Sequence, residues 1–196
     1  EITLVLDNVS LDQIKPIDEE AIEDFKYKNN IEEALQTRIF SDIEQEYMRN
    51  IDELLFQTES DNYVTIYYRS VKNEKLECYT VAKFKKKVFD GVVKYAFLTC
   101  TYNEMGADAR VVGNFEDNLK NQLISVDYNR DMSVFPGKKR FVWGNTQSED
   151  VFRLKIEGQE PTGIIRYDRF GREWYFWYYD DLQSDKPGNL LEYTVD

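Results

Sequence analysis

Six aromatic residues follow one another at positions 174–179, and this segment constrains the fold more than any other. Successive side chains of a β-strand point to opposite faces of its sheet, so a strand here places large rings on both faces. One face must belong to the core. The other face is either covered as well or exposed as an aromatic rim, which could stack on sugar rings or anchor a protein partner. The residues of this aromatic rim would be Trp174, Trp177, Tyr178 and Tyr179. Three arginines are near enough in the sequence to lie over the rings: Arg166, Arg169 and Arg172.

A helical period dominates residues 31–56. Apolar residues recur there at steps of three and four, which predicts one long helix with an apolar face: Ile31, Ala34, Leu35, Ile39, Ile43, Tyr47, Met48, Ile51, Leu54 and Leu55. Asn30 followed by Glu33 has the form of a capping box that starts such a helix. A short strand at 2–6 and a short helix entered at 16–18 are expected before it.

From residue 63 the period changes toward two, and β-branched and aromatic residues predominate, which predicts strands. The first three are expected at 63–71, 76–89 and 92–102. Asp90-Gly91 between the last two has the composition of a type I′ turn, whose two central residues both need positive φ. Residues 115–123 fit a short helix or a loop, and residues 124–128 fit a further strand. A second group of short strands is expected at 141–143, 151–156, 162–167, 173–179 and 191–195.

Helices followed by strands predict an α+β fold, in which N-terminal helices pack on a mainly antiparallel, meander-type sheet. A long helix against a curved antiparallel sheet is compatible with a cystatin-like or a nuclear-transport-factor-like architecture. We expect residues 1–196 to form a single unit. The alternative is a division into a helix-plus-meander lobe, residues 1–130, and a small β lobe, residues 138–196.

The charge of the chain excludes one class of partner. There are 37 acidic and 25 basic side chains, a net charge of −12. Basic residues cluster only at 85–87 and 138–140, which fit a strand edge and a turn. We expect no nucleic-acid binding, because that requires clustered Lys and Arg. No run of 18 apolar residues occurs, so no membrane span is expected within the chain.

Few residues are available for catalysis. The chain has no histidine, which removes the commonest general base and the imidazole metal ligand. No nucleotide-binding glycine motif occurs. Residues 127–138 begin like a calcium loop but have Met132 and Lys138 where that loop needs Gly and Glu, so an Asx-rich turn is favoured. Asp180 and Asp181 would point to opposite faces of a strand and could not flank one substrate. We expect no enzymatic activity, no cofactor and no metal.

The two cysteines, Cys78 and Cys100, fall on neighbouring predicted strands. A two-residue turn at Asp90-Gly91 would place Val81 opposite Cys100, and the two thiols would then lie on opposite faces of the sheet. One β-bulge would bring them to the same face. A disulfide therefore requires a bulge in this hairpin, and two free thiols are the alternative.

The segment Phe141-Val142-Trp143-Gly144, followed by residues 150–158, Ile164-Ile165 and the aromatic residues 174–178, resembles the small C-terminal β modules of uncharacterised secreted or membrane-anchored proteins of Gram-positive bacteria. The shared features are an aromatic-Gly corner, a strand, a glycine turn and an aromatic closing strand, within residues 141–179. The resemblance implies an extracytoplasmic, lipoprotein-like domain whose export signal or lipid anchor precedes Glu1. It supplies no catalytic residues.

Together these features predict a non-enzymatic extracytoplasmic domain of a bacterial surface-anchored protein. It would bind a protein or a cell-wall glycan through the aromatic rim. The alternative is an acidic immunity or inhibitor protein that neutralises a basic partner, because a charge of −12 steers association with a cationic surface. A cytoplasmic location is compatible with this alternative.

Overall fold

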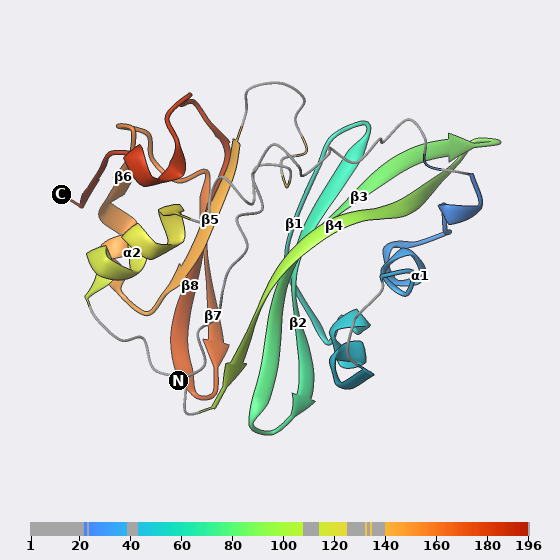
Figure 1. The fold of residues 1–196 in the computed structure, drawn as a ribbon, viewed down its shortest axis with the longest axis horizontal. Helices are drawn as coiled ribbons and strands as arrows, with labels where there is room; N and C mark the ends of the chain where they lie inside the picture. Colours follow the sequence, from blue (N-terminus) through green and yellow to red (C-terminus); the bar gives the residue numbers. More distant parts are fainter. Residues whose placement is uncertain are drawn as a thin grey trace, which may run out of the picture.

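The computed structural model describes residues 22, 24–38, 43–107, 114–124, 132, 134 and 140–195. Within these residues, two antiparallel sheets pack on each other and short helices lie on their outer faces (Figure 1). This arrangement confirms the predicted α+β class with antiparallel sheets. The predicted strand at 2–6, the helix entry at 16–18 and most of the segments 124–128 and 127–138 lie outside the described residues.

The first sheet is the predicted meander with one strand added at its start. Its strands follow the order β1-β2-β3-β4, each antiparallel to the next: β1 (Glu53–Glu59), β2 (Tyr63–Asn73), β3 (Leu76–Phe89) and β4 (Val92–Gly106). Asp90 and Gly91 connect β3 to β4 with φ angles of 50° and 82°. The predicted type I′ turn is therefore confirmed.

The second sheet has three strands in the order β5-β8-β7: β5 (Arg140–Thr146), β7 (Gly163–Arg169) and β8 (Arg172–Leu182). A two-stranded ribbon of β6 (Leu154–Ile156) and β9 (Tyr193–Val195) lies beside it. Residues 115–123 belong to a helix, α2 (Phe115–Ile124), rather than to a loop. The predicted strand at 151–156 is shorter than expected, because η7 (Glu149–Arg153) forms a 3₁₀ turn capped by Ser148. A second 3₁₀ turn, η8 (Gly188–Leu190), precedes β9.

The predicted long helix over residues 31–56 is not formed. Only α1 (Ile31–Leu35) is α-helical, η4 (Ile43–Arg49) is 3₁₀-helical, and β1 occupies the end of the predicted helix. A further 3₁₀ turn, η3 (Asp24–Lys26), comes before α1. The predicted cap is correct, because Asn30 Oδ1 accepts a hydrogen bond from the Glu33 amide at 2.7 Å.

The reason for the difference is tertiary. Residues of β1 have the apolar spacing of a helix, but they pair with β2, and a register shift between Leu54 and Phe56 breaks the simple alternation of a strand. Without β1, the edge of β2 would lack this antiparallel partner. Neither the cystatin-like nor the nuclear-transport-factor-like architecture is confirmed, since both expectations depended on the long helix.

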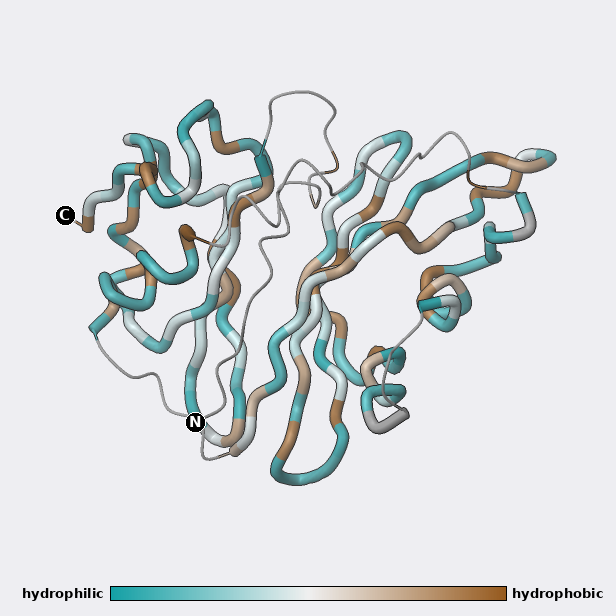
Figure 2. Tube along the Cα trace, viewed as in Figure 1, coloured by the Kyte–Doolittle hydropathy of each residue, from teal (hydrophilic) through white to brown (hydrophobic). Residues whose placement is uncertain are grey.

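Three clusters of buried side chains hold the layers together. The core between the sheets combines residues of the first sheet with residues of the second: Tyr67, Tyr79, Val81, Met132, Phe141, Tyr167, Trp174 and Phe176. On the outer face of the second sheet, Leu119 and Leu123 of α2 pack against Trp177. On the outer face of the first sheet, Ala34 and Leu35 of α1 pack against Ile66 and Phe84. In Figure 2, hydrophobic and hydrophilic segments follow one another along the strands.

The six aromatic residues 174–179 lie on β8, the central strand of the second sheet, as a strand prediction requires. Trp174 and Phe176 point into the core between the sheets, and Tyr175, Trp177 and Tyr179 into the cluster below α2. Both faces of β8 are therefore covered. No helix in the described ranges is long and apolar enough to span a membrane.

Candidate functional site

The residues of the predicted aromatic rim are largely inside the protein. Trp174, Trp177 and Tyr179 are at most 4% exposed, and half-buried Tyr178 packs against Phe56 with ring centres 4.2 Å apart. The side chains of β8 belong to a core on each face of the second sheet, so no exposed row of rings is left to bind a sugar or a protein. Contact with a partner through these side chains would require the layers to separate.

Of the three arginines near this strand, Arg169 does pack over aromatic rings. Its guanidinium carbon lies 4.9 Å from the ring centre of Trp174 and 5.1 Å from that of Tyr79. Burial lowers the pKa of this guanidinium from its ordinary value. Arg166 instead forms an ion pair with Glu173. Arg169 thus links the β7–β8 hairpin to the first sheet through cation–π contacts.

Cys78 and Cys100 are both free thiols. A register shift between β3 and β4 places Cys100 opposite Ala82 and Cys78 opposite Glu104. This bulge brings the two cysteines to the same face, but they are offset by four residues, about 13 Å of strand. Burial raises the pKa of Cys78 to about 11 and also raises the pKa of Cys100, which favours the protonated thiols.

Of the two candidate carboxylate groups, the structure describes the Asp180-Asp181 pair. Desolvation, with Asp181 as a secondary cause, raises the pKa of Asp180. The two residues are neighbours on β8, so they do not face each other across a common space. Within the calcium-like segment, Met132 is buried in the core between the sheets. The described residues contain no group of three or more side chains suited to hold a metal ion.

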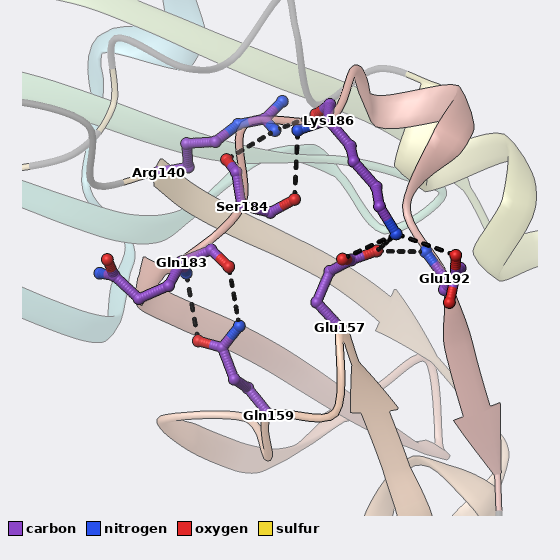
Figure 3. A network of polar contacts seen from close by, with 7 residues as sticks. All are labelled: Arg140, Glu157, Gln159, Gln183, Ser184, Lys186 and Glu192. Carbon is purple, nitrogen blue, oxygen red and sulfur yellow. Dashed lines mark hydrogen bonds and ion pairs between the residues drawn. The ribbon is translucent and has the colours of Figure 1, made fainter.

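A polar network fixes the C-terminal segment to the second sheet (Figure 3). Lys186 Nζ forms ion pairs with Glu157 at 3.0 Å and Glu192 at 2.9 Å, and Glu157 also accepts a hydrogen bond from the Glu192 amide. That backbone hydrogen bond, together with Lys186, lowers the pKa of Glu157. The remaining members are Arg140, Gln159, Gln183 and Ser184. The charged groups Lys186, Glu157 and Glu192 are paired with one another, so the network has a structural role.

An open hollow lies on the outer face of the first sheet, beside the start of α1. Its volume is about 340 Å³, and it is lined by Asn29, Asn30, Ile31, Glu32, Ile51, Leu54, Gln57, Ile66 and Tyr95. Ile66 is buried and Leu54 is 50% exposed, so apolar surface extends from the interior to the mouth. The amide and carboxylate side chains among the lining residues add hydrogen-bonding groups. We name this feature the α1 hollow.

Hydrogen bonds hold two sides of the α1 hollow in place, between main chains on one side and between side chains and main chain on the other. Lys28 and Tyr95 exchange two main-chain hydrogen bonds, at 2.8 and 2.9 Å, which attach the chain before α1 to β4. On the other side, Ser70 Oγ donates to the Asn50 carbonyl at 2.6 Å and the Val71 amide donates to Asp52 at 2.7 Å. Ile51 is thereby held against the end of β2.

The hollow was not predicted, because Ile51 and Leu54 have the spacing of the buried face of one continuous helix over residues 31–56. A local signal was present: Asn50 and Asp52, on either side of Ile51, are poor helix formers that favour turns. These two residues indicate a helix end before Ile51.

A second exposed apolar patch lies at the end of the β3–β4 hairpin, where Val88, Val92 and Val93 are 63%, 55% and 38% exposed. Figure 1 shows this hairpin extending beyond the other strands of its sheet. Two nearby lysines are already paired: Lys87 with Asp24 at 2.6 Å and Lys86 with Glu59 at 3.0 Å. These ion pairs leave little unpaired charge from Lys86 and Lys87 beside the patch, so it defines a partner less well than the α1 hollow.

Comparison of the chain with models of protein families, with curated proteins and with solved structures found no match. Its function is therefore inferred from its own residues and their geometry.

Proposed function

We propose that the chain is a non-enzymatic, extracytoplasmic domain of a bacterial surface-anchored protein, and that it binds a protein partner at the α1 hollow. The extracytoplasmic part of the proposal depends on the resemblance of residues 141–179 to secreted and membrane-anchored modules. Burial of Trp174 and Trp177 favours a protein over a glycan, because sugar binding by stacking needs an exposed ring.

The observation that carries the proposal is the continuous apolar surface from buried Ile66 to half-exposed Leu54. A volume of about 340 Å³ is at the small end of ligand-binding pockets, which range from roughly 300 to 1,000 Å³. It can hold one large apolar side chain together with adjacent backbone. Interfaces commonly obtain most of their affinity from such anchored side chains.

The test compares Leu54→Arg with Leu190→Arg, a matched control at a leucine that is 58% exposed on η8. Each variant and the wild type are immobilised and exposed to an extract of bacterial surface proteins, and the retained proteins are identified by mass spectrometry. We expect at least one protein to be retained by the wild type and by Leu190→Arg but lost with Leu54→Arg. Identical retention by all three proteins would contradict the proposal.

The second candidate, an acidic protein that neutralises a basic partner, is favoured by an uneven charge distribution. Residues 1–52 contain 14 acidic and five basic side chains, a net charge of −9, whereas residues 53–107 contain seven acidic and eight basic ones. Long-range attraction of this kind is screened by salt. If it dominates, the association rate with a captured partner should fall at least tenfold between about 50 and about 500 mM salt. A rate independent of salt would exclude it.

A further inference from the structure

We propose that the partner segment bound in the α1 hollow carries a basic residue beside its apolar anchor. This inference specifies the chemistry of the protein partner and therefore depends on the proposed function. It follows from the charges at the mouth of the hollow and from which of them are already neutralised.

Glu32 is the one charged side chain among the nine residues that line the hollow. It lies in the first turn of α1 and is exposed. Within the described residues, Glu32 forms no ion pair, and no lysine or arginine lines the hollow. A bound apolar side chain would therefore be flanked by a carboxylate that has no cation of its own.

The neighbouring carboxylates are already engaged by groups within the chain. Glu33 accepts hydrogen bonds from the Asn29 amide and from Asn30 Nδ2, both at 3.2 Å. Glu53, next to Leu54, forms an ion pair with Arg69 at 2.9 Å. These contacts leave Glu32 as the carboxylate available to a partner at this mouth.

The wider charge distribution acts in the same direction. The described residues 24–38 and 43–52 contain six acidic and four basic side chains, a net charge of −2, which favours a cationic segment over an anionic one. The polar lining residues Asn29 and Gln57 can accept hydrogen bonds from the backbone of a bound segment as well as donate to it. An apolar side chain next to Lys or Arg complements both the floor and the mouth of the hollow.

The test uses two synthetic peptides that differ only in charge, acetyl-Gly-Lys-Leu-Lys-Gly-amide and acetyl-Gly-Glu-Leu-Glu-Gly-amide. Binding to the nitrogen-15-labelled protein is followed by the amide signals of Leu54, Ile66 and Tyr95. With one anchor, dissociation constants of about 1 mM are expected. We expect the lysine peptide to shift these signals and to bind roughly two- to fivefold more tightly than the glutamate peptide, the range of an exposed ion pair.

Glu32→Lys should reverse this preference. Glu74→Lys is the matched control, because it changes the net charge equally in an exposed turn between β2 and β3. It should preserve the preference for the lysine peptide. Equal reversal by Glu74→Lys would overturn the inference, since total charge rather than Glu32 would then select the partner.

The outcomes separate this inference from the proposed function. If the glutamate peptide binds at these signals as tightly as the lysine peptide or more tightly, the inference about charge is wrong and the hollow remains a binding site. If neither peptide shifts the signals of Leu54, Ile66 and Tyr95 at about 10 mM, an order of magnitude above the expected dissociation constant, both proposals are wrong.

Discussion

Replacing Phe176 with alanine tests whether the two sheets form one cooperative unit. Phe176 is fully buried on β8, and its ring stacks on Tyr67 of the first sheet with centres 4.0 Å apart and planes 11° apart. The rings of Phe56, Trp143 and Tyr178 surround it, each with its centre 5.8 Å away. Its removal opens a cavity in the middle of the core between the sheets.

Phe176→Ala is expected to lower the free energy of unfolding by a large amount. Truncating a buried phenylalanine to alanine destabilises proteins by about 3–5 kcal/mol, because transfer energy is lost and a cavity remains. The stacked contact with Tyr67 contributes about 0.5–1.5 kcal/mol beyond burial. Domains have total stabilities of about 5–15 kcal/mol, so the variant should fold but unfold at a much lower urea concentration. Phe152→Ala, at an exposed phenylalanine on η7, should cost less than about 1 kcal/mol.

Two signals can report on the two sheets separately. All three tryptophans lie on β5 and β8, so tryptophan fluorescence follows the second sheet. Cys78 is buried on β3, so its reaction with a thiol reagent, in a Cys100→Ala background, follows the first sheet. We expect both urea midpoints to fall by the same amount in Phe176→Ala. If the fluorescence midpoint falls while the thiol midpoint stays unchanged, the sheets unfold independently, and the reasoning from a shared core is refuted.

Three further predictions concern individual groups. Gly144→Ala should destabilise the protein by about 1–3 kcal/mol in thermal unfolding, because the added Cβ would overlap Gln122 Oε1 and the ring of Trp177; an unchanged melting temperature would contradict this. Cys78 is fully buried and burial raises its pKa to about 11, so in a Cys100→Ala background this thiol should react with a disulfide reagent at pH 8 only as fast as the protein unfolds, and rapid labelling of the native protein would contradict its burial. Burial raises the pKa of Tyr167 from 10.0 to about 12, so the folded state retains this proton; the associated stability is intact below pH 10 and decreases between pH 10 and 12. A tyrosinate absorbance titration should show this group ionising later than exposed tyrosines, and ionisation together with them would contradict the assignment.

The features that follow from local chemistry were predictable from the sequence. Asp90 and Gly91 tolerate positive φ, and their turn sets the β3–β4 hairpin. Asn30 caps α1 as its spacing from Glu33 predicts. The strand character of residues 174–179 was also predictable, because aromatic residues favour a pleated, packed surface. In each case the responsible residues are close together in the chain.

The features that depend on distant partners were not predictable in the same way. Leu54 has helical spacing to Ile51 and Leu55, but pairing between β1 and β2 determines its conformation. Whether Trp177 is exposed depends on α2, which lies more than fifty residues earlier in the chain and covers that face. A single sequence shows that the rings need cover but not that α2 supplies it. For this reason an exposed aromatic rim was predicted, whereas these side chains in fact form part of a second core below α2.

The pairing of β1 with β2 and the cover that α2 gives to β8 also determine where a binding surface can exist. Complete cover on both faces of β8 uses the aromatic side chains to join α2 and the first sheet to the second sheet, so they are unavailable to a partner. On the first sheet, the cover near β1 comes from short helical segments, and the apolar side chains between α1 and β1 stay partly open. Residues 31–56 form short helical segments and the start of β1 instead of one long helix. The α1 hollow results from this difference, and Leu54 lies at its mouth. The residue that misled the secondary-structure prediction is, for this reason, the one whose substitution tests the proposed function most directly.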